Sequence, residues 1–141
     1  MAVIHVAGVL NAPGRAGFEK GNVAGTAAIL KAAASAAVHR FVHVSSLAAR
    51  KPQLSLYGAS KARSEEIVSG TALPFAIVRP PAVYGPGDRE TLDLFRMANK
   101  GFVLLPPAGR LSLIHVDDLA RFVAPGVVAL ALEDDPADAN Y

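Results

Sequence analysis

Residues 40–61, RFVHVSSLAARKPQLSLYGASK, carry the strongest local evidence for the fold of this chain. The first part, RFVHVSS at 40–46, has the β-branched and aromatic composition of a strand. After a loop that contains Pro52, the segment LYGASKARSEEIVSG at 56–70 has helical composition and ends at a glycine, a favoured helix stop. We therefore predict a strand over 40–46 and a helix over 56–70.

The flanking segments continue this alternation on both sides. AVIHVAG at 2–8 predicts a strand buried on both faces, because it is an apolar run, apart from His5, that ends in glycine. NVAGTAAILKAAASAAV at 22–38 predicts an alanine-rich helix with Asn22 as a candidate N-cap. LPFAIVRP at 73–80 predicts a third strand, ended by a pair of prolines. Alternating strands and helices are typical of an α/β protein with a parallel sheet and right-handed crossovers.

The other segments are assigned by their turn residues and periodicity. We expect turns or loops at 10–21 and 82–88, a helix over 89–101, extended pieces at 102–109 and 111–116, a helix over 116–132 kinked or interrupted at Pro125–Gly126, and an acidic tail at 133–141. We therefore expect residues 1–132 to form one domain, followed by the tail.

Composition limits the class of protein and its partners. A chain of 141 residues with 52% hydrophobic and 18% charged residues is one globular domain at most. It has no cysteine, which excludes disulfides and thiolate metal sites and fits a cytoplasmic location. MAVIHVAGVL lacks the basic start of a signal peptide, and FVAPGVVALAL at 122–132 is too short to cross a bilayer, so no membrane partner is expected.

The charges are distributed unevenly along the chain. Through Arg63 there are 8 basic residues and one acidic residue, whereas from Ser64 onward there are 6 basic and 11 acidic residues. The basic residues of the first half are scattered singly, without interleaved aromatic residues. A nucleic-acid site would need a clustered basic stripe, so we expect none. A mildly positive surface beside an anionic cofactor is the preferred interpretation.

The spacing of Tyr57 and Lys61 indicates proton chemistry. Positions i and i+4 share one face of a helix, so the lysine ammonium can lie near the phenol. A nearby positive charge favours a phenolate, which could take the proton of a substrate alcohol while hydride leaves the same carbon. A serine at the carboxyl end of the preceding strand, Ser45 or Ser46, could donate to the substrate oxygen.

Structural roles for the same residues remain open. Lys61 could be a solvated residue paired with Glu65, and the serines could simply bond to the strand-end backbone. Asn22 could be only an N-cap. Asp117 and Asp118 point apart on a helix, so one is expected to cap it and the other to be solvated. The four histidines show no ligand spacing on one helix, and no metal is expected.

Five ordered segments resemble the extended short-chain dehydrogenase/reductase family, the group that contains NAD(P)-dependent epimerases and dehydratases. They are VIHVAG, NVAGT, VHVSS followed by YGASK, RPPAVYGPGD and LIHVDDLA, and the resemblance covers nearly the whole chain from Val3 to about Leu132. The resemblance implies a partial Rossmann-like parallel sheet, about strands 4 to 6 of the family with flanking helices, plus the start of a substrate domain. Residues 1–132 would then be a partial NAD(P)-binding domain whose substrate-side loops begin at about residue 80. It implies an oxidoreductase that transfers hydride at a carbonyl or alcohol carbon.

The resemblance also implies the residues of the site. The catalytic residues would be Ser46, Tyr57, Lys61 and Asn22. NAD or NADP would contact Ala7, Gly8, Ser45, Tyr57, Lys61, Pro80, Pro81 and Val83. The helices that begin near Asn22 and Tyr57 would form a homodimer.

Two departures from the family pattern affect these expectations. The Gly-x-x-Gly-x-x-Gly turn that seats the pyrophosphate is absent, and Gly14, Gly17 and Gly21 do not replace it. Roughly 60–70 residues of two βαβ units would precede VIHVAG in the family. We therefore expect VIHVAG to be an open sheet edge and hypothesise a truncated enzyme or gene fragment.

The second departure is Ala82, where relatives that act on nucleotide sugars often have asparagine. A sugar-nucleotide substrate is therefore less favoured, and a steroid-like, sterol or other carbonyl or alcohol substrate is left open. Two further interpretations remain: a non-catalytic binding or assembly protein that retains the scaffold, and a small regulatory domain unrelated to the family.

Overall fold

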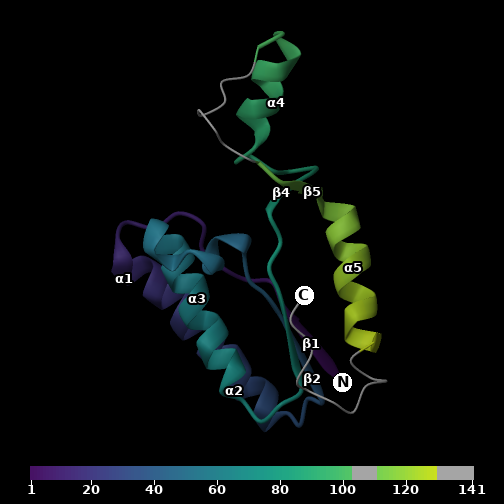
Figure 1. Ribbon diagram of the computed structural model, residues 1–141. Helices are drawn as coiled ribbons and strands as arrows, with labels where there is room; N and C mark the ends of the chain where they lie inside the picture. The colour runs from purple at the N-terminus through teal and green to yellow at the C-terminus, as the bar shows by residue number, and fades with distance from the viewer. Residues whose placement is uncertain (103–110, 130–141) are drawn as a thin grey trace.

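The structure is a computed structural model that describes residues 1–102 and 111–129 (Figure 1). A three-stranded parallel sheet has the order β1-β2-β3, and a separate parallel pair joins β4 to β5. The strands are β1 Ala2–His5, β2 Arg40–Val44, β3 Phe75–Val78, β4 Ala82–Tyr84 and β5 Leu113–His115. The predicted α/β class with a parallel sheet is confirmed, and so are the strands predicted within 2–8, 40–46 and 73–80.

The first helical segment begins earlier than predicted. It runs without a break through α1 (Arg15–Phe18), a π-helical turn η1 (Glu19–Ala24) and α2 (Gly25–Ser35). The prediction of a turn through residue 21 was therefore wrong, because the glycines there serve packing against the helix. A β-carbon on Gly17 would lie 2.7 Å from the β-carbon of Ala12, and one on Gly21 would overlap Val9. Glycine at both positions lets the loop after β1 lie flat against the helix.

The second helix matches its prediction closely. It is α3, Leu56–Ser69, and it is followed by Gly70. The hydroxyl of Ser55 caps its start by accepting a bond of 2.9 Å from the amide of Gly58. Two short 3₁₀ helices, η2 (Leu47–Arg50) and η3 (Pro52–Leu54), form the loop that precedes it.

Beyond β3 the outcome of the predictions is mixed. Helix α4 (Leu92–Asn99) lies within its predicted range, and β5 lies within 111–116. Residues 82–84 form β4 instead of a simple loop, because β5 pairs with them, Ala82 opposite Leu113. Helix α5 (Val116–Ala129) continues through Pro125–Gly126, so the predicted interruption there was wrong. Residues 103–110 and the acidic tail at 133–141 lie outside the described residues.

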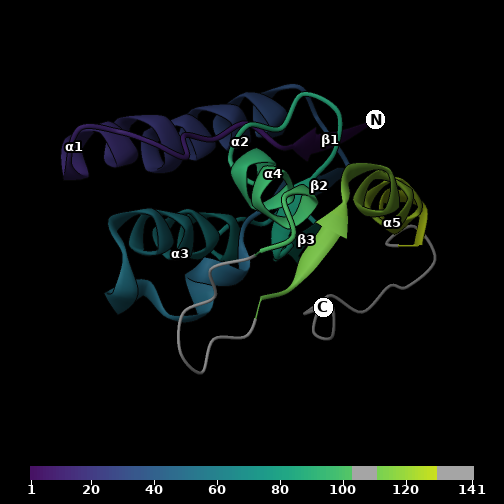
Figure 2. The same cartoon turned by 90° about the horizontal axis from the view of Figure 1, so that it is seen from above.

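Helices cover the two faces of the three-stranded sheet differently (Figures 1 and 2). Helices α2 and α3 lie on one face and α5 lies on the other. Because strand side chains alternate, β2 contributes Phe41 to the first face and Val42 and Val44 to the second. One core cluster therefore contains Leu30, Ala33, Val38, Phe41, Val68 and Ile77, and the other contains Val42, Val44 and Val123.

Strand β1 is an edge strand, as expected from the sequence. Its prediction as buried on both faces was wrong, because Ile4 is 42% exposed and Val6, just beyond the strand, is 65% exposed. The reason is the placement of α5, whose Leu119 and Val123 pack on residues of β2 and β3. Among residues 1–102 and 111–129, no helix is both long and apolar enough to cross a bilayer.

The face under α2 and α3 also holds two buried histidines. His5 and His43 are paired across β1 and β2, and their rings stack with centroids 5.3 Å apart. His5 bonds to the Thr26 hydroxyl at 3.1 Å, whereas neither ring nitrogen of His43 has a partner in the described part of the chain. Burial lowers the pKa of His43 to about 3, with smaller contributions from Lys61 and His5. Burial also lowers the pKa of His5.

This histidine pair predicts acid lability. In the unfolded chain His43 binds a proton below about pH 6.5, whereas in the folded chain it stays neutral until about pH 3. The free energy of unfolding therefore falls as the pH falls through this window. The slope contributed by one such group is about 1.4 kcal/mol per pH unit. We expect His43→Leu to flatten the pH dependence, measured by urea unfolding between pH 7.5 and 4. The exposed His39→Leu is the control, and an equal slope in both variants would contradict the assignment.

Candidate active site

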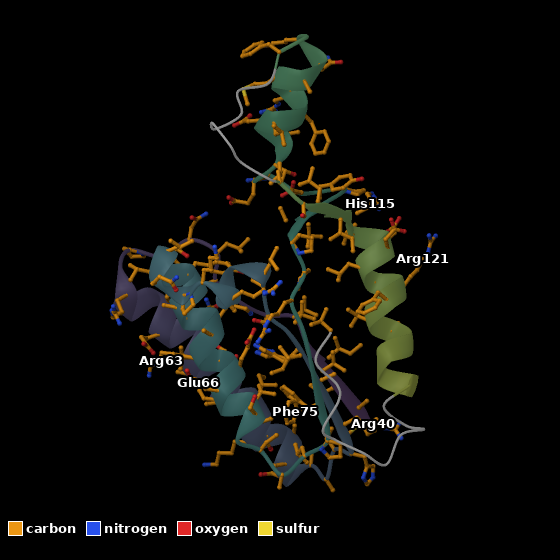
Figure 3. All side chains as sticks on the ribbon, in the orientation of Figure 1. Arg40, Arg63, Glu66, Phe75, His115 and Arg121 are labelled. Carbon is orange, nitrogen blue, oxygen red and sulfur yellow. The ribbon has the colours of Figure 1, made fainter. Side chains whose placement is uncertain are left out.

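Lys61 lies at the centre of the candidate site. It is 4% exposed, and its Nζ donates a hydrogen bond of 2.9 Å to the carbonyl of Val44, the last residue of β2. The interpretation of Lys61 as a solvated residue paired with Glu65 was therefore wrong. Burial lowers the pKa of Lys61, and the charge of Glu65 partly opposes this effect. The opposite face of α3 is exposed and charged, since it carries Arg63 and Glu66, which lie away from the sheet (Figure 3).

Asn22 connects the loop after β1 to α3. It is 2% exposed; its Oδ1 accepts from the amide of Val9 at 2.6 Å, and its Nδ2 donates to the Val9 carbonyl at 3.1 Å. The same Nδ2 donates to the Ser60 hydroxyl at 2.8 Å. The N-cap interpretation was wrong, because the helix begins at Arg15 and Asn22 lies in its π-helical turn.

Two serines of α3 complete this network, and the sequence analysis missed both. The Ser60 hydroxyl donates to the Tyr57 carbonyl at 2.7 Å. The Ser64 hydroxyl lies within hydrogen-bonding distance of the Asn22 carbonyl, 3.0 Å, and of the Ser60 carbonyl, 2.9 Å. Their spacing of four residues, on the helix face that also carries Lys61, was a signal that could have identified them.

Gly8 borders Lys61 and Asn22 from the end of β1. A β-carbon at this position would lie 3.2 Å from Oδ1 of Asn22 and 3.9 Å from Nζ of Lys61. Because Ala7 and Gly8 are both exposed, they present open backbone beside the buried lysine. The predicted proximity of Gly8, Asn22 and Lys61 is thus present in the structure.

The two candidate serines at the end of β2 differ in their surroundings. Ser45 is 5% exposed, and its hydroxyl has no partner among the described residues. Ser46 is half-buried, and its Oγ accepts a bond of 3.2 Å from the amide of Ala48, so it caps η2. This is the backbone role that the sequence left open for Ser46. Its own hydroxyl proton is still available for donation.

Tyr57 lies in the first turn of α3, one turn before Lys61. It is half-buried, and its ring centroid lies 6.3 Å from that of Phe18. The next residue, Gly58, allows close packing of α3 on η2, since a β-carbon there would lie 2.7 Å from the Ala48 carbonyl oxygen. This contact fixes the start of α3, and with it Tyr57, against the segment that follows Ser46.

The loop after β3 closes the same end of the sheet. The amide of Ser45 donates to the Val78 carbonyl at 2.7 Å, and the amide of Leu47 donates to the Pro80 carbonyl at 2.9 Å. Pro80 is buried, and Pro81 and Val83 are half-buried. The ends of β1, β2 and β3 thus converge with the start of α3, and the carboxyl ends of parallel strands are where such sheets bind ligands.

The predicted acidic pair and His115 lie apart from this site, at the start of α5. The His115 Nδ1 lies 3.7 Å from a carboxylate oxygen of Asp117, and Asp118 pairs with Arg121 at 3.4 Å. Within residues 1–102 and 111–129, no group of three or more histidine, aspartate or glutamate side chains could hold a metal ion.

This arrangement defines an α/β protein of the Rossmann-like kind with a tyrosine–lysine helix at the carboxyl end of its sheet. The family model "NAD dependent epimerase/dehydratase family" matches residues 1–131. The chain belongs to this family.

Several proteins of known sequence or structure are similar to parts of the chain. It is 49% identical over 119 residues to a ceramide reductase of Caulobacter vibrioides, a match that covers 83% of this chain and 37% of the reductase. A UDP-glucuronic acid 4-epimerase of Bacillus cereus, solved with NAD, has a TM-score of 0.74 at 19% identity, covering 90% of this chain and 49% of the epimerase. A dTDP-glucose 4,6-dehydratase of Streptomyces venezuelae, solved with NAD, has a TM-score of 0.64 at 26% identity, and the match covers 87% of this chain and 47% of the dehydratase. The chain thus spans half or less of the length of these relatives.

The contact at Gly58 predicts opposite effects for two Gly→Ala substitutions. Gly58→Ala would force a methyl group against the Ala48 backbone, so we expect a loss of about 1–3 kcal/mol in unfolding free energy. Gly25→Ala is the matched control, because Gly25 is helical and a β-carbon there would come no closer than 3.9 Å to its neighbours. Alanine at position 25 should stabilise by about 0.5–1 kcal/mol. Urea unfolding of both variants measures the difference, and equal effects would contradict the packing.

Proposed function

We propose that the protein containing this chain is an NAD-dependent oxidoreductase that transfers hydride at a carbonyl or alcohol carbon, with Tyr57 as acid and base. One observation carries the proposal. A buried lysine, held at the end of β2 by the Val44 carbonyl, follows a half-buried tyrosine by one helical turn. Family membership supports the oxidoreductase class, and its name favours NAD over NADP.

The residues around Lys61 fit the nicotinamide end of the cofactor. Gly8 leaves exposed backbone where a β-carbon would crowd Asn22 and contact Lys61, and Ser45 offers a buried hydroxyl without a partner in the described chain. The residues that would hold the cofactor are those expected from the sequence: Ala7, Gly8, Ser45, Tyr57, Lys61, Pro80, Pro81 and Val83. For the pyrophosphate we assign no residue, because Gly17 and Gly21 serve the packing of the loop on its helix.

In this proposal the side chains of the protein accept and return the hydroxyl proton of the substrate. During oxidation, Tyr57 as phenolate takes the hydroxyl proton, while the carbon hydrogen leaves as hydride and the carbonyl forms. Bound NAD supplies the hydride acceptor. Lys61 lies one helical turn from Tyr57, and Ser46 donates a hydrogen bond to the substrate oxygen. Asn22 and Ser60 hold the loop after β1 and the start of α3 in position.

For the substrate we propose a carbonyl of a ceramide-class lipid over a sugar nucleotide. The reductase of Caulobacter vibrioides is 49% identical, whereas the dTDP-glucose dehydratase is 26% identical and the UDP-glucuronic acid epimerase 19%. Ala82 supports this choice, because it cannot offer the side-chain amide found in many enzymes of nucleotide sugars. A cytoplasmic location, expected from the lack of cysteine, belongs to the same proposal.

A non-catalytic assembly role is the second candidate, favoured by the open edge of β1. The outer backbone edge of β1 would pair with another strand, and a partner lying on the sheet face would cover the exposed side chains of Ile4 and Val6. The predicted homodimer through the helices that begin near Asn22 and Tyr57 is also a proposal. A shallow groove along these helices, lined by Val23, Ala27 and Ile67 and by charged residues that include Arg15 and Lys20, would suit such contact.

Tyr57→Phe tests the catalytic role. We expect a loss of turnover of about 10²-fold or more in the full-length protein, because the proton acceptor is removed while the ring is kept. NADH affinity, measured by fluorescence titration, should change little.

The matched control is Tyr84→Phe. The Tyr84 ring lies 5.3 Å from Phe95 and 5.2 Å from His115, contacts that phenylalanine retains. Normal turnover is expected for this variant. Retained activity in Tyr57→Phe would refute the acid–base role, and failure of the wild-type protein to bind NADH would favour the assembly role.

A further inference from the structure

Glu65 is placed to compete for Lys61 but is bound elsewhere. The two residues are four positions apart on α3, the spacing at which a lysine and a glutamate on one helix normally pair. Glu65 is 7% exposed, and in this water-poor position a free carboxylate would be drawn strongly to the neighbouring ammonium. Both residues nevertheless bond to groups outside the helix.

Arg79 takes both oxygens of Glu65. Its Nε lies 3.0 Å from Oε1 and 3.2 Å from Oε2, and its Nη2 lies 2.7 Å from Oε2. This fork-like contact matches the planar guanidinium to the carboxylate and leaves no oxygen uncontacted. Arg79 directly follows β3 and precedes Pro80, so the contact also ties α3 to the loop that closes the site.

We propose that Arg79 is a positioning residue that holds the Glu65 carboxylate away from Lys61 and so leaves the lysine ammonium on the Val44 carbonyl. The catalytic importance of Lys61 rests on the proposed function. The position and protonation of the Lys61 side chain, which Arg79 is proposed to control, can be measured independently of that function. Without the arginine, the Glu65 side chain can rotate toward Lys61, which lies one helical turn earlier on α3. The ammonium would then have a carboxylate partner in place of the strand-end carbonyl, away from Gly8.

The titratable groups that surround Lys61 lie on three elements, β1, β2 and α3. His5 on β1 and His43 on β2 lie close enough that the lysine charge lowers the pKa of each. On α3 itself, Glu65 opposes the effect of burial on the pKa of Lys61, and Tyr57 lies one turn away. The two histidines are buried as neutral rings, so Glu65 is the group whose movement can change the field at the lysine most. The position of the Glu65 carboxylate therefore determines the electrostatic environment of the Lys61 ammonium.

The test measures the pKa of Lys61 from the ¹⁵N shift of its side chain, without substrate or cofactor. We expect Arg79→Met to raise this pKa by about one unit, as a newly available carboxylate does. Glu65→Gln should lower it, because the opposing charge is lost. In the double variant E65Q/R79M the pKa should equal that of Glu65→Gln alone, because the arginine acts only through the glutamate.

Two results would overturn the proposal. An equal rise on Arg79→Met with and without Glu65 would mean a simple through-space effect of the arginine charge. No rise in the wild-type background would mean that the Glu65–Arg79 contact is purely structural.

Arg79→Lys keeps the test decisive if Arg79→Met does not fold. A single ammonium cannot hold both oxygens, so an intermediate rise is expected, and a wild-type pKa would overturn the proposal. Turnover is measured separately in the full-length protein. A wild-type protein without activity would refute the proposed chemistry, whereas the order of the four pKa values would still decide the role of Arg79.

Discussion

The hydrogen bond from the Lys61 ammonium to the Val44 carbonyl is the constraint on which the rest of the site depends. A cation almost fully removed from water must have an oxygen partner, because an unpaired buried charge costs several kcal/mol. The partner is a backbone group at the end of the central strand, so the bond links the inward face of α3 to the end of β2. Ser60 and Ser64 lie on the same side of α3, and the close contact of Gly58 with Ala48 fixes the start of the helix and with it Tyr57.

The space between the helices and the sheet is divided into an apolar part and a polar part. At one end Phe41, Val68 and Ile77 form a conventional core. Toward the carboxyl ends of the strands the same layer contains His43, Ser45 and Lys61, all buried. The apolar end supplies the stabilisation that offsets the desolvation of the polar end, where the chemistry would take place.

Local sequence signals predicted the elements that are specified locally. The strands at 40–46 and 73–80 and the helix at 56–70 have clear composition and clear stops. Strand β4 was missed because it exists only by pairing with β5, which is remote in sequence. The start of the first helix was missed because Gly17 and Gly21, which normally indicate turns, are required there by close packing.

The candidate site was predictable in outline only. The order of the motifs placed Gly8, Asn22 and Lys61 in one neighbourhood, and the structure brings them together. The sequence could not show which partner each side chain would choose. Asn22 bonds to Val9 and Ser60, and Glu65 bonds to Arg79 in preference to Lys61; both choices depend on tertiary contacts between segments distant in the chain.

The π-helical turn at Glu19–Ala24 has a consequence for comparing this chain with relatives. Such a turn contains one residue more than an α-helical turn, so the helix before it and the helix after it are out of phase. A helical wheel drawn through the whole segment would therefore assign the faces of one half wrongly. In an alignment to a relative whose helix is regular, a one-residue gap belongs here, because an ungapped alignment would displace every inward-facing position on one side of Asn22.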